Sequence, residues 1–207
     1  MATIVVRGDL PEDVADQLLR ARRVAVDTET TGLDWRWERL ALCQVHAPET
    51  GTILVQLDGS RTPERLSALV SDPDVTKVFH HAPFDLRFML RTWGGTAQNI
   101  ACTKVASKVL HPGRPNDEHS LRALVRRRLG IPLDKGAVRT SDWSARTLTV
   151  EQLSYAAADV EHLLPLLDGL LGDLEEVGRA AQYISCCEYL PTQVDLSLRG
   201  LEDAFAY

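Results

Sequence analysis

The chain has 207 residues, of which 44% are hydrophobic and 25% are charged, so it can bury one sizeable core, and we predict a single domain over residues 1–207. Its net charge is −6, which is the wrong sign for a protein that holds long duplexes mainly by neutralising phosphates. Any contact with nucleic acid should therefore be local.

The N-terminal sequence MATIVVRGDLPED has an apolar run of only four residues before charge and proline, so we expect no signal peptide. No apolar stretch is long enough to span a membrane. The four cysteines lack C-x-x-C and zinc-type spacing, and two of them are adjacent, which argues against a disulfide framework. These features predict a cytoplasmic protein that does not contact a membrane.

The first third of the chain contains short apolar runs and one amphipathic segment. That segment, residues 11–21, predicts a helix with Leu18 and Leu19 facing inward. Residues 48–51 are typical of a turn and predict a hairpin-like pair of strands around them. The expected strands span residues 3–6, 24–26, 40–46 and 52–57.

From residue 63 onward, short apolar runs alternate with helical patterns, which is typical of an α/β fold with a mixed sheet. The best-defined helix begins at Thr149, whose side chain can cap it. Gln152, three residues later, can complete a capping box by bonding back to the Thr149 main chain. Its apolar stripe continues to Leu167, and Pro165 should kink it. Residues 110–118 are expected to form an exposed loop. The other expected elements are a strand at 77–79 and helices at 63–70, 83–91, 103–110 and 119–129.

Acidic residues recur at the ends of the predicted core elements. Asp27 and Glu29 lie two apart on a strand, so both carboxylates point to one face and need a positive charge between them. Asp85 lies near the start of a helix, where an acid also stabilises the helix dipole. Tyr155 and Asp159 are four apart, on one face of a helix. Taken singly, each of these residues also fits a structural role.

In the order in which they occur, these residues resemble the motifs of the ribonuclease D family, which are DEDD-type 3′→5′ exonucleases of the tyrosine subclass. The three motifs are VAVDTETTGL, FHHAPFDL and YAAADVEHL. The stretches CTKVASKVL and LDKGAVRTSDW, between the second and third motifs, are also similar to that family. The histidine subclass would carry its histidine at position 154, which is Ser154 here. The likeness covers residues 20–170.

This resemblance implies a ribonuclease H-like fold, in which helices flank a mixed β-sheet, and a two-metal active site. The implied metal ligands are Asp27, Glu29, Asp85 and Asp159, and Tyr155 would orient the attacking water. Four oxygen donors without cysteine or histidine spacing suit two divalent cations, Mg²⁺ or Mn²⁺. The expected reaction is hydrolysis of nucleic acid to 5′-mononucleotides by two-metal-ion catalysis.

Further residues in or near the motifs are candidates for contacts with the substrate. Leu33 resembles the apolar residue that such exonucleases wedge against terminal bases, the alternative being a leucine that anchors a turn. His81 stands where many family members carry asparagine. Trp35 and Trp37 flank Arg36, and this mixture either stacks a base or anchors the loop. The candidate substrate-binding residues are Thr28, Leu33, His81, Phe84, Lys104, Lys135 and Ser141.

The short chain and its two ends resemble a compact branch of the family called nano-RNase C. The likeness implies a 3′→5′ exoribonuclease that acts on short oligoribonucleotides, including dinucleotides. Members of that branch assemble into rings, and the C-terminal segment, residues 171–207, offers apolar side chains for the interface of a homo-oligomer. The alternatives are trimming of longer RNA 3′ ends, hydrolysis of single-stranded DNA, and a nucleic-acid-binding module without activity.

Overall fold

Six strands form the central sheet in the computed structural model, which describes residues 3–133 and 136–206. They are β1 (Thr3–Arg7), β2 (Arg23–Thr30), β3 (Leu40–Ala47), β4 (Gly51–Gln56), β5 (Thr76–Phe79) and β6 (Ile100–Cys102). Their order across the sheet is β1-β4-β3-β2-β5-β6. β3 pairs antiparallel with β2 and with β4, and the other neighbours are parallel. The sheet is therefore mixed, as predicted.

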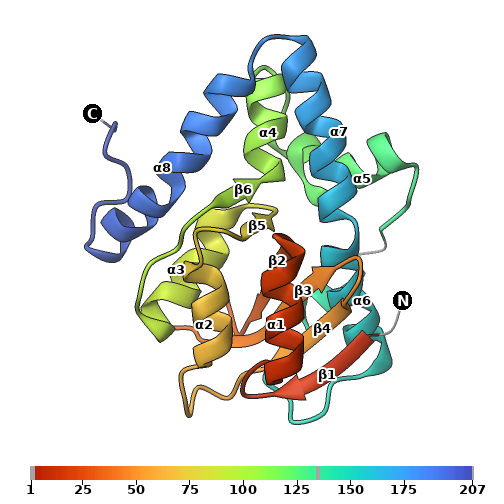
Figure 1. Ribbon diagram of the computed structural model, residues 1–207, viewed down its shortest axis with the longest axis vertical. Coiled ribbons are helices and arrows are strands. Elements are labelled where there is room, and N and C mark those ends of the chain that lie inside the picture. The colour runs from red at the N-terminus through yellow and green to blue at the C-terminus, as the bar shows by residue number, and fades with distance from the viewer. Residues whose placement is uncertain (1–2, 134–135, 207) are drawn as a thin grey trace.

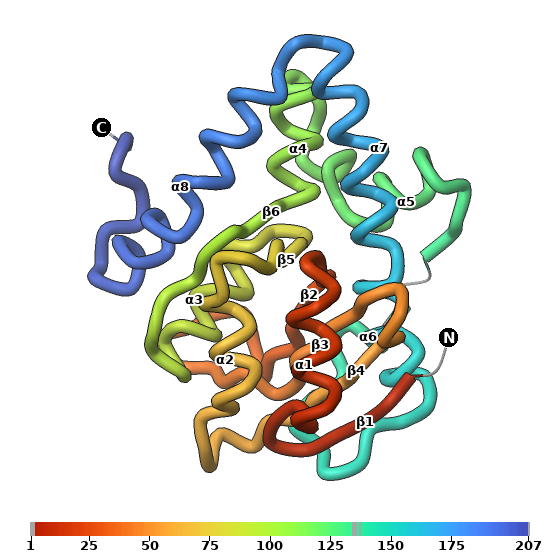
Figure 2. Tube along the Cα trace, in the orientation of Figure 1, coloured from red at the N-terminus to blue at the C-terminus, as the bar shows by residue number. Residues whose placement is uncertain are grey.

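Helices flank this sheet and extend beyond one end of it. They are α1 (Glu12–Ala21), α2 (Glu64–Ser71), α3 (Ala82–Trp93), α4 (Thr103–Leu110), α5 (Leu121–Leu129), α6 (Val150–Glu161), α7 (Leu163–Glu176) and α8 (Ala180–Leu198). Figure 1 shows α1 and α2 in front of the sheet and α6 behind it, where α6 packs on β2, β3 and β4. The trace in Figure 2 shows α8 running from the end of α7 past α4 toward α3. In the described part of the chain, no helix could cross a membrane.

The central strand β2 carries the first two acidic residues. Its first half is apolar and fully buried at Val24, Ala25 and Val26, which fixes the strand between β3 and β5. β2 extends further than predicted, because β3 pairs with it as far as Thr30. Asp27 and Glu29 therefore lie within the strand. The pairing register between β2 and β3 shifts directly after Glu29, and irregularities of this kind are common next to active sites.

The start of α6 is held by the predicted capping box. Thr149 Oγ1 accepts a hydrogen bond from the Gln152 main-chain N–H at 3.2 Å, and Gln152 Oε1 accepts one from the Thr149 N–H at 2.9 Å. The Gln152 amide nitrogen also donates to Ser141 Oγ and to the Asp142 carbonyl. The cap thus fixes α6 to the loop before it.

Several local predictions differ from the structure. Leu19 was expected to face inward, but it is 37% exposed, because α1 turns only its Leu18 face toward the core. The helix after Thr149 does not kink at Pro165: α6 and α7 are separate helices, and Pro165 lies in the first turn of α7, where its missing N–H breaks no helical hydrogen bond. The helix expected over residues 119–129 begins at Leu121, after a short 3₁₀ turn.

Candidate active site

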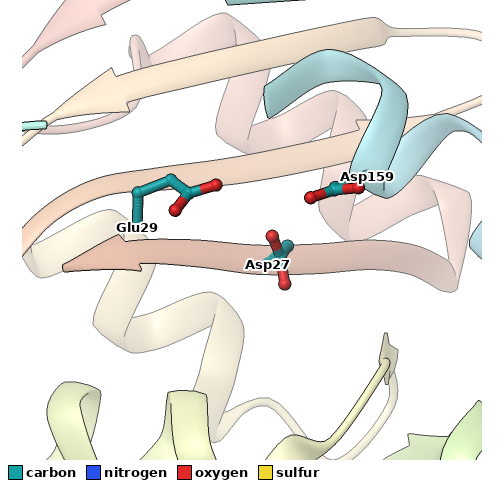
Figure 3. A group of neighbouring side chains, drawn as sticks. All are labelled: Asp27, Glu29 and Asp159. Atoms are coloured by element: carbon teal, nitrogen blue, oxygen red, sulfur yellow. The ribbon is translucent and has the colours of Figure 1, made fainter. Parts of the chain in front are cut away.

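Three of the predicted acidic residues form a tight cluster. Asp27 and Glu29 from β2 and Asp159 from α6 each offer a carboxylate oxygen, and these oxygens all lie within 4.8 Å of one another. Figure 3 shows the three side chains pointing toward the space between the strand and the helix. Oxygen ligands of a single octahedral Mg²⁺ ion are about 3–4 Å apart, so the cluster fits a hard divalent cation. Such a cation would also offset the repulsion among the carboxylates.

Asp85 lines the same cavity from the first turn of α3, although it is not one of those three residues. Its side chain is 3% exposed, and its Oδ1 accepts a hydrogen bond of 2.6 Å from the Thr28 hydroxyl. Burial raises the pKa of Asp85 to about 7; the Thr28 hydrogen bond opposes this rise, whereas the negative charge of Asp159 adds to it. Near neutral pH, both the protonated and the charged form of this carboxyl group are therefore populated.

Tyr155 lies one helical turn before Asp159 on α6. Its ring packs against Trp143, with the ring centroids 5.8 Å apart. Burial raises the pKa of Tyr155 well above its usual value, and the negative charges of Asp159, Glu29 and Asp27 raise it further. The phenol therefore keeps its proton at neutral pH, so it can donate a hydrogen bond but cannot act as a base.

The acids and Tyr155 line a cavity of about 260 Å³, which adjoins a second cavity of about 380 Å³. Thr28, Glu29, Phe84 and Arg139 line both. Leu33, which is 84% exposed, lies at the second cavity. The structure thus brings predicted substrate-binding residues next to the acidic cluster; these are Thr28, Leu33, His81, Phe84 and Ser141.

Some of these side chains already have partners within the protein. The Thr28 hydroxyl donates to Asp85, and the Ser141 hydroxyl donates to the Val138 carbonyl while it accepts from Gln152. These two hydroxyls hold the site together, and their contact with substrate stays a prediction.

His81 precedes α3 with a φ of 88°, in the left-handed region that few side chains adopt. His81 is exposed, and partial desolvation together with the positive charges of Lys104, Arg87 and Lys108 lowers its pKa. The imidazole is therefore neutral at pH 7. Lys104 is half-buried and lines neither cavity, whereas the predicted contact Lys135 lies outside the described residues.

Arg139 and His80 also line the acidic cavity, although neither was among the predicted site residues. Arg139 lies within the family-like stretch LDKGAVRTSDW, and that likeness is the sequence feature that could have indicated a place at the site. His80 Nδ1 forms a hydrogen bond with Thr103 Oγ1. The Arg36 guanidinium packs over the ring of Trp35 and also pairs with Glu202. These contacts favour the alternative in which Trp35 and Arg36 anchor the loop.

Comparison with known proteins gives the family. A model of the family described as "3′-5′ exonuclease" matches residues 3–175. The chain belongs to this family. It is also 37% identical over 166 residues to ribonuclease D of Gluconacetobacter diazotrophicus, a match that covers 80% of this chain and 41% of the relative. The chain thus spans about two fifths of the length of the curated ribonuclease D relatives it matches.

Solved structures of this exonuclease family share the fold. NrnC of Brucella melitensis is 34% identical, with a TM-score of 0.91 and coverage of 100% of both chains. That protein has also been solved bound to pGG and with bound Mg²⁺. Escherichia coli RNase D is 26% identical, with a TM-score of 0.79 over 94% of this chain and 51% of that one. The predicted ribonuclease D family, and its NrnC-like branch, are therefore confirmed.

Proposed function

We propose that this protein is a metal-dependent 3′→5′ exoribonuclease that hydrolyses short oligoribonucleotides, dinucleotides included, to 5′-mononucleotides. The observation that carries the proposal is the cluster of Asp27, Glu29 and Asp159, with Asp85 and Tyr155 lining the same cavity. Support comes from NrnC of B. melitensis, which matches this chain over its full length and has been solved bound to pGG.

The metal ligands in this proposal are Asp27, Glu29, Asp85 and Asp159, and the cofactors are two Mg²⁺ or Mn²⁺ ions. When bound, these ions supply an activated water and stabilise charge on the phosphate. Thr28 holds the carboxylate of Asp85 in place through its hydrogen bond. Tyr155 remains a neutral donor, because burial and the neighbouring acids raise its pKa, and we assign it to orienting the attacking water.

The second cavity is the proposed site for the terminal nucleotide. It combines the exposed side chain of Leu33 and the half-buried ring of Phe84 with the Arg139 side chain. Apolar and aromatic side chains can stack on a base, while a guanidinium binds a phosphate. Its volume of about 380 Å³ lies at the small end of ligand sites, which favours recognition of one or two nucleotides. Contacts from His81, Lys104 and Lys135 remain part of the proposal.

Charge is the second argument for short substrates. The chain carries a net charge of −6, and the basic run on α5 is largely engaged within the protein. Arg127 pairs with Glu118, and Arg128 pairs with Asp173. Tight binding of long RNA depends on many unpaired basic side chains that contact phosphates. We therefore expect longer RNA to bind weakly.

We also propose that the C-terminal segment forms a homo-oligomer interface. Ile184 on α8 is half exposed and Phe205 is 81% exposed, although the Phe205 ring also packs on Tyr189 within the same chain. Light scattering after size exclusion tests this, and a 23.0 kDa monomer at micromolar concentration would contradict it.

The decisive experiment is hydrolysis of a ladder of 5′-labelled RNA, from two to about twenty nucleotides, with and without a chelator. We expect metal-dependent release of mononucleotides that is fastest for the shortest RNA, and no release by Asp85→Asn. Faster hydrolysis of the long RNA, or of matched single-stranded DNA, would favour those substrates instead. Binding of RNA without any hydrolysis in Mg²⁺ or Mn²⁺ would identify an inactive binding module.

A further inference from the structure

A separate cavity of about 310 Å³ shares Trp143 in its lining with the candidate nucleotide site. Three arginines from distant parts of the sequence line it: Arg7 at the end of β1, Arg39 just before β3, and Arg146 in the loop before α6. The fold joins these segments, because the Gln56 amide donates to the Ala145 carbonyl and the Arg7 guanidinium donates to the Arg146 carbonyl. We call this space the arginine cavity.

The three arginines have no carboxylate partner within 4.0 Å in the described part of the chain. Among the described residues, the side chains of Arg7 and Arg39 donate to main-chain carbonyls, Arg7 to Arg146 at 2.7 Å and Arg39 to Asp58 at 3.4 Å. Asp58 is the one acid in the described lining, and its carboxylate accepts from the Ser60 N–H, so three arginines face a single carboxylate. The guanidinium groups therefore retain donors for an external anion.

The lining also has an apolar part that an inorganic anion would not use. Ala41, Leu57 and the buried Trp143 provide it. A small cavity that combines apolar walls with a few convergent charged groups is typical of small-molecule sites. We infer that the arginine cavity binds a nucleoside 5′-monophosphate, with the phosphate on the arginines and the nucleoside against the apolar wall.

Such a ligand would be coupled to the candidate active site through Trp143. This residue lines both the arginine cavity and the proposed terminal-nucleotide cavity, and its ring contacts the ring of Tyr155. The neighbouring loop is fixed to α6 by the Gln152 amide. A bound mononucleotide therefore contacts a wall of the active site, and we expect it to slow hydrolysis. Only this effect on the rate rests on the proposed function; the binding itself does not.

Calorimetry with AMP in the presence of EDTA tests the binding. Chelation removes the divalent ions that would attract a phosphate to the acidic cluster. We expect one AMP per chain, and a loss of affinity of about tenfold in Arg39→Gln and in Arg146→Gln, as hydrogen bonds to a charged group imply. The matched control is Arg126→Gln, an exposed arginine on α5 that does not line the cavity, and it should bind as the wild type does.

Several results would overturn the inference. The first is an unchanged affinity in both cavity variants, and the second is adenosine binding as tightly as AMP. The third is a loss of AMP binding in Phe84→Ala, which would place the ligand in the candidate active site. Competition by inorganic phosphate would support the anion site, and equal affinity for phosphate and AMP would show that the nucleoside is not recognised and so contradict the mononucleotide. Thermal melting of each variant shows whether it is folded.

The rate is measured separately, by adding AMP to dinucleotide hydrolysis in Mg²⁺. Inhibition should have a component that Arg146→Gln removes while the rate without AMP stays at the wild-type level. If the enzyme hydrolyses dinucleotides but AMP fails to bind in EDTA, the inference fails and the proposed function stands. If AMP binds as expected but no RNA is hydrolysed, the proposed function fails and the site stands.

Discussion

The substitution Thr28→Val should weaken the binding of divalent cations without disturbing the fold. Valine keeps the branched shape of threonine but removes the hydroxyl that donates to Asp85 Oδ1 at 2.6 Å. Both side chains are buried, so water cannot easily replace the lost donor. A carboxylate that loses a hydrogen bond in such a place favours its protonated form.

The size of the effect follows from the ionisation of Asp85. Burial already raises the pKa of Asp85 to about 7, so the charged and neutral forms are nearly balanced at neutral pH. A hydrogen bond to a charged group contributes about 1.5–3 kcal/mol, and a protonated carboxyl group must lose its proton before it binds a metal. We therefore expect the apparent affinity for Mn²⁺ at pH 7 to fall about ten- to a hundredfold. The loss should shrink as the pH rises, because the carboxyl group then ionises in the variant too.

Titration calorimetry with Mn²⁺ between pH 6 and pH 9 measures this directly. Thr28→Ser is the matched control, because it keeps the hydroxyl, and it should retain wild-type affinity. A Thr28→Val protein that binds Mn²⁺ at pH 7 as tightly as the wild type would refute the role of the hydrogen bond. A loss of the same size at pH 9 would refute the ionisation argument, since it would point to a distorted site.

Three further predictions concern Tyr155, the metal-free protein and the helix cap. Tyr155→Phe keeps the ring on Trp143 and should lower kcat on a dinucleotide about tenfold, a much smaller loss than for Asp85→Asn; equal losses would contradict a water-orienting role. In EDTA, the free energy of unfolding should fall by up to about 4 kcal/mol from pH 4 to pH 7, because Asp85 stays protonated to a higher pH in the folded protein than in the unfolded chain. Urea denaturation across this pH range measures the change. The same pH dependence in Asp85→Asn would exclude Asp85 as its source. Thr149→Ala should cost about 1 kcal/mol and lower the melting temperature by about 2–4 °C, whereas an unchanged melting curve would show that the capping box is not stabilising.

The sequence predicted the elements of the fold better than their junctions. Apolar periodicity located the strands and helices near the site, but β6 has only three residues, which is too short for a periodic signal. Likewise, the apolar stripe continues from α6 into α7, so it could not show that the helices separate near Pro165. Junctions depend on contacts with distant elements, which a local pattern does not contain.

The grouping of acids could be predicted only from the order of the motifs. Spacing placed Asp27 and Glu29 on one face of a strand, but nothing local indicated that Asp159, some 130 residues later, would bring its carboxylate within 4.8 Å of theirs. The contact between Thr28 and Asp85 and the position of Arg139 between two cavities were not foreseen, because both depend on how α3 and the loop before α6 pack around β2. The family resemblance identified the candidate site residues, whereas their contacts with neighbouring side chains could be seen only in the packed structure.

The charge around the acidic cavity predicts that substrate binding depends on the proposed metal ions. Its described lining contains four carboxylic acids and one arginine, Arg139, while His81 is neutral because partial desolvation and nearby positive charges lower its pKa. A phosphate entering this cavity without a cation would meet more negative than positive charge, so its approach is unfavourable. Chelation should therefore remove binding of the dinucleotide itself as well as hydrolysis. Retention of full dinucleotide affinity in EDTA, measured by calorimetry with the uncleaved substrate, would show that side chains outside this cavity hold the RNA.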